Sequence, residues 1–262
     1  MKIGFSTLGC PEWSLREVVA SAKDFGYDGI ELRGLKGEIY LPSAHEFSPS
    51  KLEETKAYIA QTGLELCCLT SGALLYQDCS AEVLDYISLA AKLNIKYIRV
   101  LGDEKPQASA EAKDEAVLRS LHTLVPAAAA HGVTLCVETN GIYANSTRLE
   151  KLVSQFDGKV GVLWDIHHPY RFFGEQPADT YRLLKPYLKH VHIKDSLLDN
   201  GTVRYKMLGE GDIPVREAIT LLHQDQFEGY VSLEWVKRWN QELEEPNIVF
   251  ARFIDFVQRM IK

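Results

Sequence analysis

Short apolar runs alternate with longer amphipathic segments along the whole chain. Apolar runs bounded by glycine or polar residues are typical of buried strands, whereas apolar positions spaced three and four apart indicate helices. The strands are expected at 3–8, 27–33, 64–70, 96–101, 133–137, 160–165, 190–194 and 230–233. The helices are expected at 13–25, 49–62, 80–93, 110–131, 147–156, 177–188, 213–225 and 244–261.

This alternation predicts an α/β protein whose strands are parallel, because each strand is followed by a helix that crosses back. Eight such units close naturally into a single (β/α)8 TIM barrel, and we expect one domain over residues 1–262. An open doubly wound sheet is the alternative. The first strand–helix turn, Thr7-Leu8-Gly9-Cys10-Pro11, lacks the GxGxxG fingerprint of that fold.

Polar side chains of the kinds that carry chemistry follow four of the expected strands. Side chains alternate between the two faces of a strand, so Val191 and Ile193 share one face while His192 and Lys194 share the other. Active sites of (β/α)8 barrels lie at the carboxyl ends of the strands. The residues expected there are Glu138 at the end of strand five, Asp165 at the end of strand six, His192 at the end of strand seven and Glu234 at the end of strand eight.

Three carboxylates buried together repel one another unless a cation neutralises them. Glu138, Asp165, His192 and Glu234 are therefore predicted to bind one divalent metal ion. Carboxylate oxygens with one imidazole nitrogen suit Mn²⁺, Co²⁺, Zn²⁺ or Mg²⁺ better than an ion that seeks thiolates. The alternative interpretation ties these groups into hydrogen bonds of the surrounding loops.

Composition narrows the class of partner. The chain of 262 residues has a formal net charge of −7, so no global basic field would hold a nucleic acid. The N-terminus reads as a strand rather than a signal peptide, and no apolar run has the length of a membrane span. The five cysteines show no CxxC spacing, which is typical of reduced thiols. We therefore expect a cytoplasmic protein without a membrane or nucleic-acid partner.

Several motifs together resemble the xylose isomerase-like superfamily of sugar phosphate isomerases and epimerases, in order and in spacing. They are Gly29-Ile30-Glu31-Leu32, Val137-Glu138-Thr139-Asn140, Asp165-Ile166-His167-His168, His192-Ile193-Lys194-Asp195 and Leu233-Glu234-Trp235. The resemblance implies that the four ligand positions hold one divalent metal, with Mn²⁺ as the first expectation. It also implies that Glu138 and Glu234 are paired acid/base groups and that His168 contacts substrate oxygens.

The chain departs from particular branches of this superfamily. Ketose 3-epimerases carry an arginine soon after the strand-seven histidine, whereas Lys194 is the cation here and Arg204 is a substitute from the following loop. Endonuclease IV-type members have an Asp-x-His pair in this region, but Leu208-Gly209-Glu210-Gly211-Asp212 contains no histidine. That turn resembles the one that closes over substrate in many members. The Ser-Leu-Glu-Trp ending at 232–235 also resembles 3-dehydroshikimate dehydratases.

The expected function is a sugar isomerase or epimerase of carbohydrate metabolism that works through a metal-stabilised enediolate. Lys194, Arg204, Arg33 and Arg99 are candidate substrate-binding residues, although partners such as Glu31 are an alternative for the two strand-end arginines. The alternatives are a metal-dependent dehydratase of the 3-dehydroshikimate or inosose type and a sugar-binding barrel without catalysis. A DNA-repair nuclease is least favoured. The sugar, its phosphorylation state, the native metal and a homo-oligomeric state stay open.

Overall fold

A computed structural model describes residues 1–104 and 111–261. The chain forms two compact units. Unit 1 comprises Met1–Cys67 and His192–Lys262, and unit 2 comprises Cys68–Val191. The organisation of residues 1–262 as one domain stays a prediction.

The strands confirm the predicted fold class, since eight of them form a closed barrel in the order β1-β10-β7-β6-β5-β4-β3-β2. The fold is an α/β, single (β/α)8 TIM barrel. Every predicted strand is found within a few residues of its expected position. The barrel strands are β1 (Lys2–Ser6), β2 (Gly29–Leu32), β3 (Glu65–Leu74), β4 (Tyr97–Leu101), β5 (Thr134–Glu138), β6 (Val160–Asp165), β7 (Leu188–Ile193) and β10 (Tyr230–Leu233).

The helices also follow the predicted order. They are α1 (Leu15–Phe25), α2 (Leu52–Ala60), α3 (Ser80–Leu93), α4 (Glu111–Ala130), α5 (Ser146–Val153), α6 (His167–Phe173), α7 (Pro177–Leu184), α8 (Val215–Gln224) and α9 (Pro246–Ile261). The expected start of the α4 helix at residue 110 lies outside the described residues. The short helix α6 was not predicted, because its seven residues span too few turns to show a helical period.

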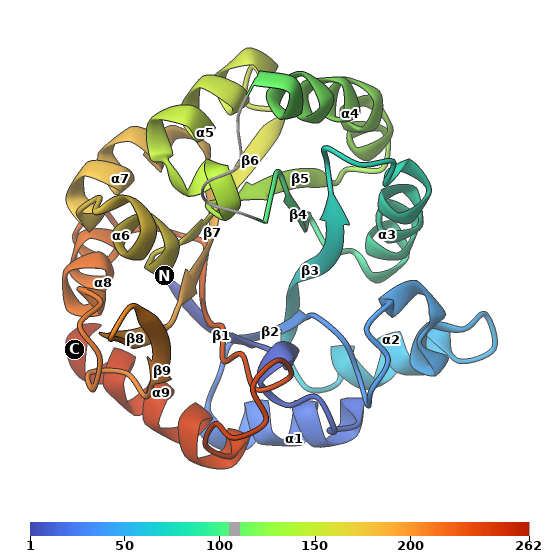
Figure 1. Ribbon diagram of the computed structural model, residues 1–262. Helices are drawn as coiled ribbons and strands as arrows, with labels where there is room; N and C mark the ends of the chain where they lie inside the picture. The colour runs from blue at the N-terminus through green and yellow to red at the C-terminus, as the bar shows by residue number, and fades with distance from the viewer. Residues whose placement is uncertain (105–110, 262) are drawn as a thin grey trace. The chain divides into compact units, whose positions relative to one another are not determined.

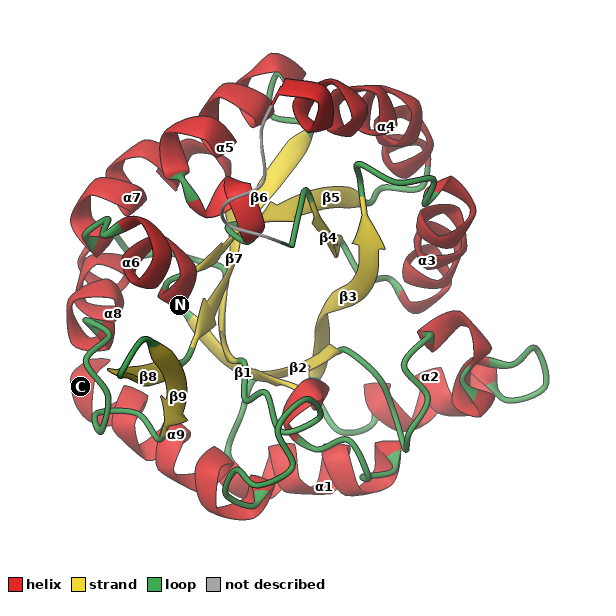
Figure 2. Cartoon of the chain, in the orientation of Figure 1, coloured by secondary structure: helices red, strands yellow, loops and turns green. Residues whose placement is uncertain are grey.

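A two-stranded antiparallel hairpin, β8 (Asp195–Asp199) and β9 (Thr202–Lys206), replaces the loop that was expected after β7 (Figure 2). That expectation was wrong. Asn200 and Gly201 between the strands both have positive φ angles, of 48° and 82°. Asn-Gly is the commonest pair for a two-residue hairpin turn, so the sequence did contain the signal.

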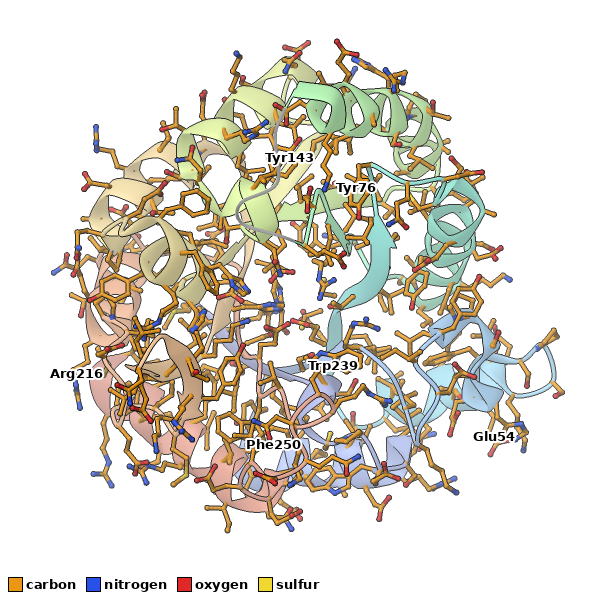
Figure 3. All side chains as sticks on the ribbon, in the orientation of Figure 1. Glu54, Tyr76, Tyr143, Arg216, Trp239 and Phe250 are labelled. Carbon is orange, nitrogen blue, oxygen red and sulfur yellow. The ribbon has the colours of Figure 1, made fainter. Side chains whose placement is uncertain are left out.

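In unit 1, β1 lies between β2 and β10, and α1 and α9 lie on the outer side of these strands (Figure 1). Phe5 of β1 stacks on Phe250 of α9 with ring centroids 4.2 Å apart, and both rings are fully buried (Figure 3). Ser6 pairs in register with Glu31 at the carboxyl end of β2. This packing fixes the strand ends that carry the candidate site residues of unit 1.

In unit 2, β3, β4, β5 and β6 pair as parallel neighbours, with Arg99 opposite both Thr70 and Cys136 and with Glu138 opposite Leu163. Leu135, Val137 and Val162 are fully buried. Strands buried on both faces need apolar residues throughout, so the polar residues near their carboxyl ends stand out as candidates for function. Within the described ranges, no helix has the length and apolar character needed to cross a bilayer.

Candidate metal and substrate site

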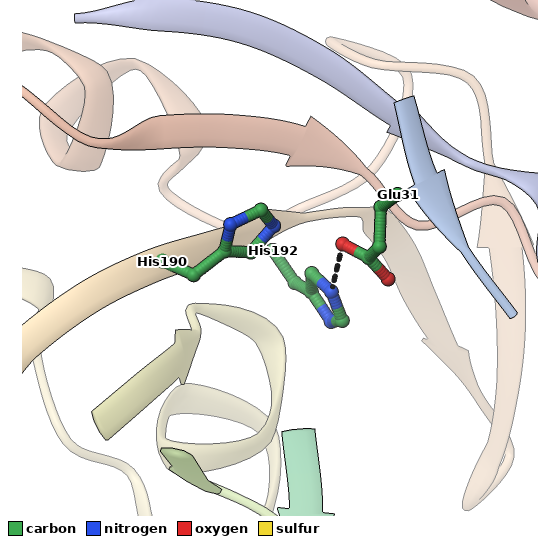
Figure 4. A group of neighbouring side chains, drawn as sticks. All are labelled: Glu31, His190 and His192. Carbon is green, nitrogen blue, oxygen red and sulfur yellow. Dashed lines mark hydrogen bonds and ion pairs between the residues drawn. The ribbon is translucent and has the colours of Figure 1, made fainter. Parts of the chain in front are cut away.

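His192 in unit 1 lies between the carboxylates of Glu31 and Glu234, and Figure 4 shows its contact with Glu31. Its Nε2 lies 2.8 Å from Oε2 of Glu31, at hydrogen-bond distance, and its Nδ1 lies 3.4 Å from Oε1 of Glu234. His192 and Glu31 are fully buried, and Glu234 is 4% exposed. Each carboxylate therefore faces a different nitrogen of the same imidazole ring.

Lys194 completes this arrangement from the same stretch of chain as His192. Its ammonium forms a buried ion pair with Oε2 of Glu234. The backbone N–H of Glu234 donates to the carbonyl oxygen of Ile193, 3.0 Å away, so the two strand ends are aligned. Because side chains alternate along the chain, His192 and Lys194 both face Glu234 while Ile193 packs on the opposite side. The local pattern seen in the sequence produces this placement.

Glu138 at the end of β5 in unit 2 is fully buried and has its own cation. Its Oε2 lies 2.9 Å from Nε of Arg99, which is 5% exposed. Nη1 of Arg99 also donates to the backbone carbonyl oxygen of Ser71, at 2.6 Å. Arg99 of β4 is thus fixed between the Ser71 carbonyl oxygen of β3 on one side and the Glu138 carboxylate on the other. Its predicted role as a substrate-binding residue stays a prediction.

Asp165 at the end of β6 is held by the neighbouring strand end. Its backbone N–H donates to Oγ1 of Thr139, which donates in turn to the Asp165 carbonyl oxygen, at 2.8 and 2.9 Å. Oδ1 accepts a hydrogen bond of 2.9 Å from the backbone N–H of His167. Oδ2 lies 3.4 Å from Nε2 of His168. The ligand atoms of Asp165, His167 and His168 lie within 4.8 Å of one another, as do the carboxylate oxygens of Asp165 and Glu138.

Two other predicted residues in unit 1 have identified neighbours. The guanidinium of Arg33 lies 5.8 Å from the centre of the Trp239 ring, and the Arg33 backbone N–H donates to Oγ1 of Thr7. Arg204 lies on β9 of the hairpin and not in a loop, with 62% of its side chain exposed. Its Nε forms an ion pair of 2.6 Å with Asp199. Substrate contact by Arg33 and Arg204 stays a prediction.

Asp195 organises the turn that follows the hairpin, a role that sequence reasoning missed. Its buried carboxylate accepts hydrogen bonds from the backbone N–H groups of Ser196, Gly209, Gly211 and Ile213, at 2.8 to 3.2 Å. Burial raises the pKa of Asp195, and these four N–H groups oppose that rise. An acid directly after the His192-Ile193-Lys194 motif was the only hint in the sequence.

Glu31 is the second residue whose role in the site was missed in the sequence. Its contact with His192 was not predicted. The alternation within Gly29–Leu32 separates Glu31 from the apolar side chains of Ile30 and Leu32. That signal placed Glu31 on a polar face and offered it as a partner for arginine. It could not show that the carboxylate bonds to His192.

Comparison with known structures supports a shared fold. D-psicose 3-epimerase from Clostridium cellulolyticum H10, solved with D-tagatose, has a TM-score of 0.78 and 19% identity, with 100% of both chains covered. The probable 3-DHS dehydratase AsbF of Bacillus anthracis, involved in petrobactin synthesis, has a TM-score of 0.81 and 17% identity, covering 98% of this chain and 99% of the other.

A third solved structure is an IOLI protein with a bound zinc atom, with a TM-score of 0.81, 18% identity and 99% of both chains covered. A search of curated protein sequences found no match. The family model for the xylose isomerase-like TIM barrel matches residues 19–251, which is most of the chain. The buried carboxylates and imidazoles described above lie at strand ends inside that matched region. The chain therefore belongs to the xylose isomerase-like TIM barrel family.

Proposed function

We propose that this protein is a divalent-metal-dependent isomerase or epimerase that acts on a ketose or a sugar phosphate. The observation that carries the proposal is the pair of buried glutamates at strand ends, each with its own buried cation. Glu138 is paired with Arg99, and Glu234 is paired with Lys194. An ion pair favours the ionised carboxylate, which is the form that accepts a proton.

The proposed metal ligands are Glu138, Asp165, His192 and Glu234. Within unit 2 the carboxylate oxygens of Glu138 and Asp165 lie within 4.8 Å of each other, and within unit 1 the same holds for a ring nitrogen of His192 and a carboxylate oxygen of Glu234. Three carboxylates and one imidazole are the donors that Mn²⁺, Co²⁺, Zn²⁺ and Mg²⁺ accept, and no thiolate takes part. The donor set therefore fits a divalent ion, with Mn²⁺ as the first choice. When bound, such an ion supplies Lewis-acid polarisation of a substrate carbonyl.

The chain's own groups provide the proton transfers. One of the two glutamates, Glu138 or Glu234, removes the proton from the carbon next to the substrate carbonyl. In an epimerisation the other glutamate takes up a proton from solvent and delivers it to the opposite face of that carbon. His168, Arg33 and Arg204 are proposed to bind substrate oxygens. Lys194 keeps the Glu234 carboxylate ionised and oriented through its ion pair.

Solvent deuterium exchange tests this proposal directly. The protein loaded with Mn²⁺ is incubated in D₂O with a panel of ketoses and ketose phosphates, and proton NMR follows the carbon-bound hydrogens. We expect exchange next to the carbonyl in at least one substrate, and its loss in Glu138→Gln and Glu234→Gln. Glu54→Gln is the matched control, because Glu54 is exposed on α2 and pairs with Lys51, three positions earlier (Figure 3). Exchange at the wild-type rate in either site variant would refute the paired-glutamate mechanism.

A dehydratase is the second candidate, favoured by the contact between Lys194 and Glu234. Here a glutamate removes the same proton, the carbon–carbon double bond forms, and the β-hydroxyl leaves with a proton as water. The Lys194 ammonium, beside Glu234, is positioned as a donor for that second proton. The same NMR experiment separates the two candidates, because a dehydratase yields an unsaturated product with new vinyl signals and an epimerase does not.

A further inference from the structure

We propose that Glu31 is a positioning residue that fixes the tautomer of His192, so that the imidazole presents Nδ1 as its ligand atom. This inference rests on the proposed metal-dependent function and extends it to a residue outside the four proposed ligands. It starts from the burial of Glu31, which is complete. A carboxylate removed from water is costly unless hydrogen bonds and charges compensate, so its partners define its role.

The Glu31–His192 contact determines which ring nitrogen carries the hydrogen. Nε2 of His192 and Oε2 of Glu31 lie 2.8 Å apart, and an ionised carboxylate only accepts hydrogen bonds, so in the proposed arrangement Nε2 is the donor. In a neutral ring this leaves the lone pair on Nδ1. A metal-binding histidine commonly donates its other N–H to a carboxylate, which fixes the orientation of the ring and strengthens its basicity.

The two contacts of the His192 ring differ in length. A charged N–H···O⁻ hydrogen bond is typically about 2.7–2.9 Å long, and the Glu31 contact falls in that range. Nδ1 of His192 lies 3.4 Å from Oε1 of Glu234, beyond that range. The ring thus hydrogen-bonds to Glu31 through Nε2 and only faces Glu234 through Nδ1. Two groups that accept rather than donate, facing each other across this distance, are the arrangement expected of co-ligands of one cation.

Strands β2 and β7 hold Glu31 and His192 in place. Glu31 ends the parallel pairing of β2 with β1, opposite the buried Ser6, while His192 lies one residue before the end of β7 (Figure 4). Glu234, on the other side of His192, is fixed in turn by Lys194. The ring of His192 is therefore oriented from both sides by residues of unit 1.

The experiment compares Glu31→Ala and Glu31→Gln with the wild type in two measurements besides activity. Electron paramagnetic resonance titration with Mn²⁺ alone gives the metal affinity. Nitrogen NMR of the metal-free protein gives the His192 tautomer, with the signals assigned by their loss in His192→Gln. Glu65→Gln is the matched control: Glu65 is also a strand glutamate of unit 1, but its side chain is 56% exposed and pairs with Lys2.

We expect the wild-type ring to carry its hydrogen on Nε2. Glu31→Ala should lose this single tautomer and bind Mn²⁺ about 10- to 100-fold more weakly. Glu31→Gln should retain part of both properties, because its amide oxygen still accepts from Nε2, and Glu65→Gln should match the wild type. Thermal unfolding of each variant shows that the fold is retained.

Two results would overturn the inference. One is Mn²⁺ affinity in folded Glu31→Ala within twofold of the wild type, which would leave the proposed metal-dependent function intact. The other is a wild-type His192 ring protonated on Nδ1 or on both nitrogens. If the wild type binds no divalent ion, the proposed function fails instead, and the tautomer in metal-free wild type and Glu31→Ala still decides the role of Glu31.

Discussion

Oδ2 of Asp195 lies 3.0 Å from the backbone nitrogen of Gly211, and the two residues fit together without room for a side chain at position 211. A Cβ atom there would clash with the Asp195 carboxylate and with the Ser196 carbonyl oxygen. The turn at 208–212 is thus built around one carboxylate. The turn follows the β8–β9 hairpin, which begins directly after the motif that carries His192 and Lys194.

Gly211→Ala should therefore displace the turn and weaken substrate binding more than it changes the rate of bound substrate. Overpacking of a tight contact typically costs about 1–3 kcal/mol, so we also expect a lower free energy of unfolding. Steady-state kinetics and urea denaturation measure the two effects. Gly201→Ala, in the hairpin turn where a Cβ meets no neighbouring atom, reports the backbone cost of a positive φ alone. Equal KM values for the wild type and Gly211→Ala would contradict a role for the turn in binding.

Arg99→Ala should destabilise the fold strongly, because it removes the buried cation beside Glu138. Breaking a buried ion pair by deleting one partner costs about 3–5 kcal/mol, since the other charge stays buried. The double variant Arg99→Ala/Glu138→Gln should recover part of this loss. Urea denaturation of the two single variants and the double variant gives the coupling free energy, and strict additivity would show that the two side chains do not interact.

Metal removal should lower the melting temperature of the wild type, and added Mn²⁺ should restore it. A ligand that binds only the folded state stabilises it by about 2.7 kcal/mol at one hundred times its dissociation constant. Asp165→Asn should lose this response, whereas Asp78→Asn, at an exposed position, should keep it. Differential scanning calorimetry with chelator and with Mn²⁺ checks the outcome. A wild-type melting temperature that is indifferent to both additions would contradict the proposed site.

Alkaline pH should destabilise the protein through its buried thiols. Burial raises the pKa of Cys136 to about 12, whereas an unfolded thiol ionises near about 8.5. A raised folded pKa gives stability that is complete below the unfolded value and is lost as pH rises toward the folded value. Between pH 8.5 and 10 this loss is about 2 kcal/mol for one thiol. Urea denaturation at pH 8 and 10 should show a smaller decrease in the free energy of unfolding for Cys136→Ala than for the wild type. Equal decreases would show that the Cys136 thiol is not a cause of the alkaline destabilisation.

Ser14→Ala should destabilise helix α1 without affecting the candidate site. Ser14 is the N-cap of α1, its side chain accepts from the Glu17 backbone N–H, and the Glu17 carboxylate accepts from the Ser14 backbone in return. Loss of such a cap costs about 1 kcal/mol. Ser14→Asp keeps a capping oxygen and serves as the control in thermal unfolding. A cost in Ser14→Asp as large as in Ser14→Ala would show that capping is not the cause.

The sequence by itself determined the order and type of the eight barrel strands and of every α-helix except α6, because each of these has a local period of apolar residues. The prediction of Glu138, Asp165, His192 and Glu234 as metal ligands also came from the sequence, since each interrupts or ends an apolar strand, and it stays a prediction. The sequence did not reveal the β8–β9 hairpin as strands, because those residues are largely exposed and lack a clear apolar alternation. The Asn200-Gly201 pair did indicate a hairpin turn, but without a buried face the flanking residues were interpreted as a loop.

The tertiary structure decided which side chains touch. Alternation along a strand shows which face a residue occupies, but it does not show the neighbour across that face. Glu31 and His192 are separated by 161 positions and still form a hydrogen bond. Asp195 accepts hydrogen bonds from the backbone N–H group of the adjacent Ser196 and from three more, those of Gly209, Gly211 and Ile213, in a segment that has no periodic pattern of its own. Such contacts depend on strand pairing and loop closure between distant segments, and local residue patterns carry no information about that pairing.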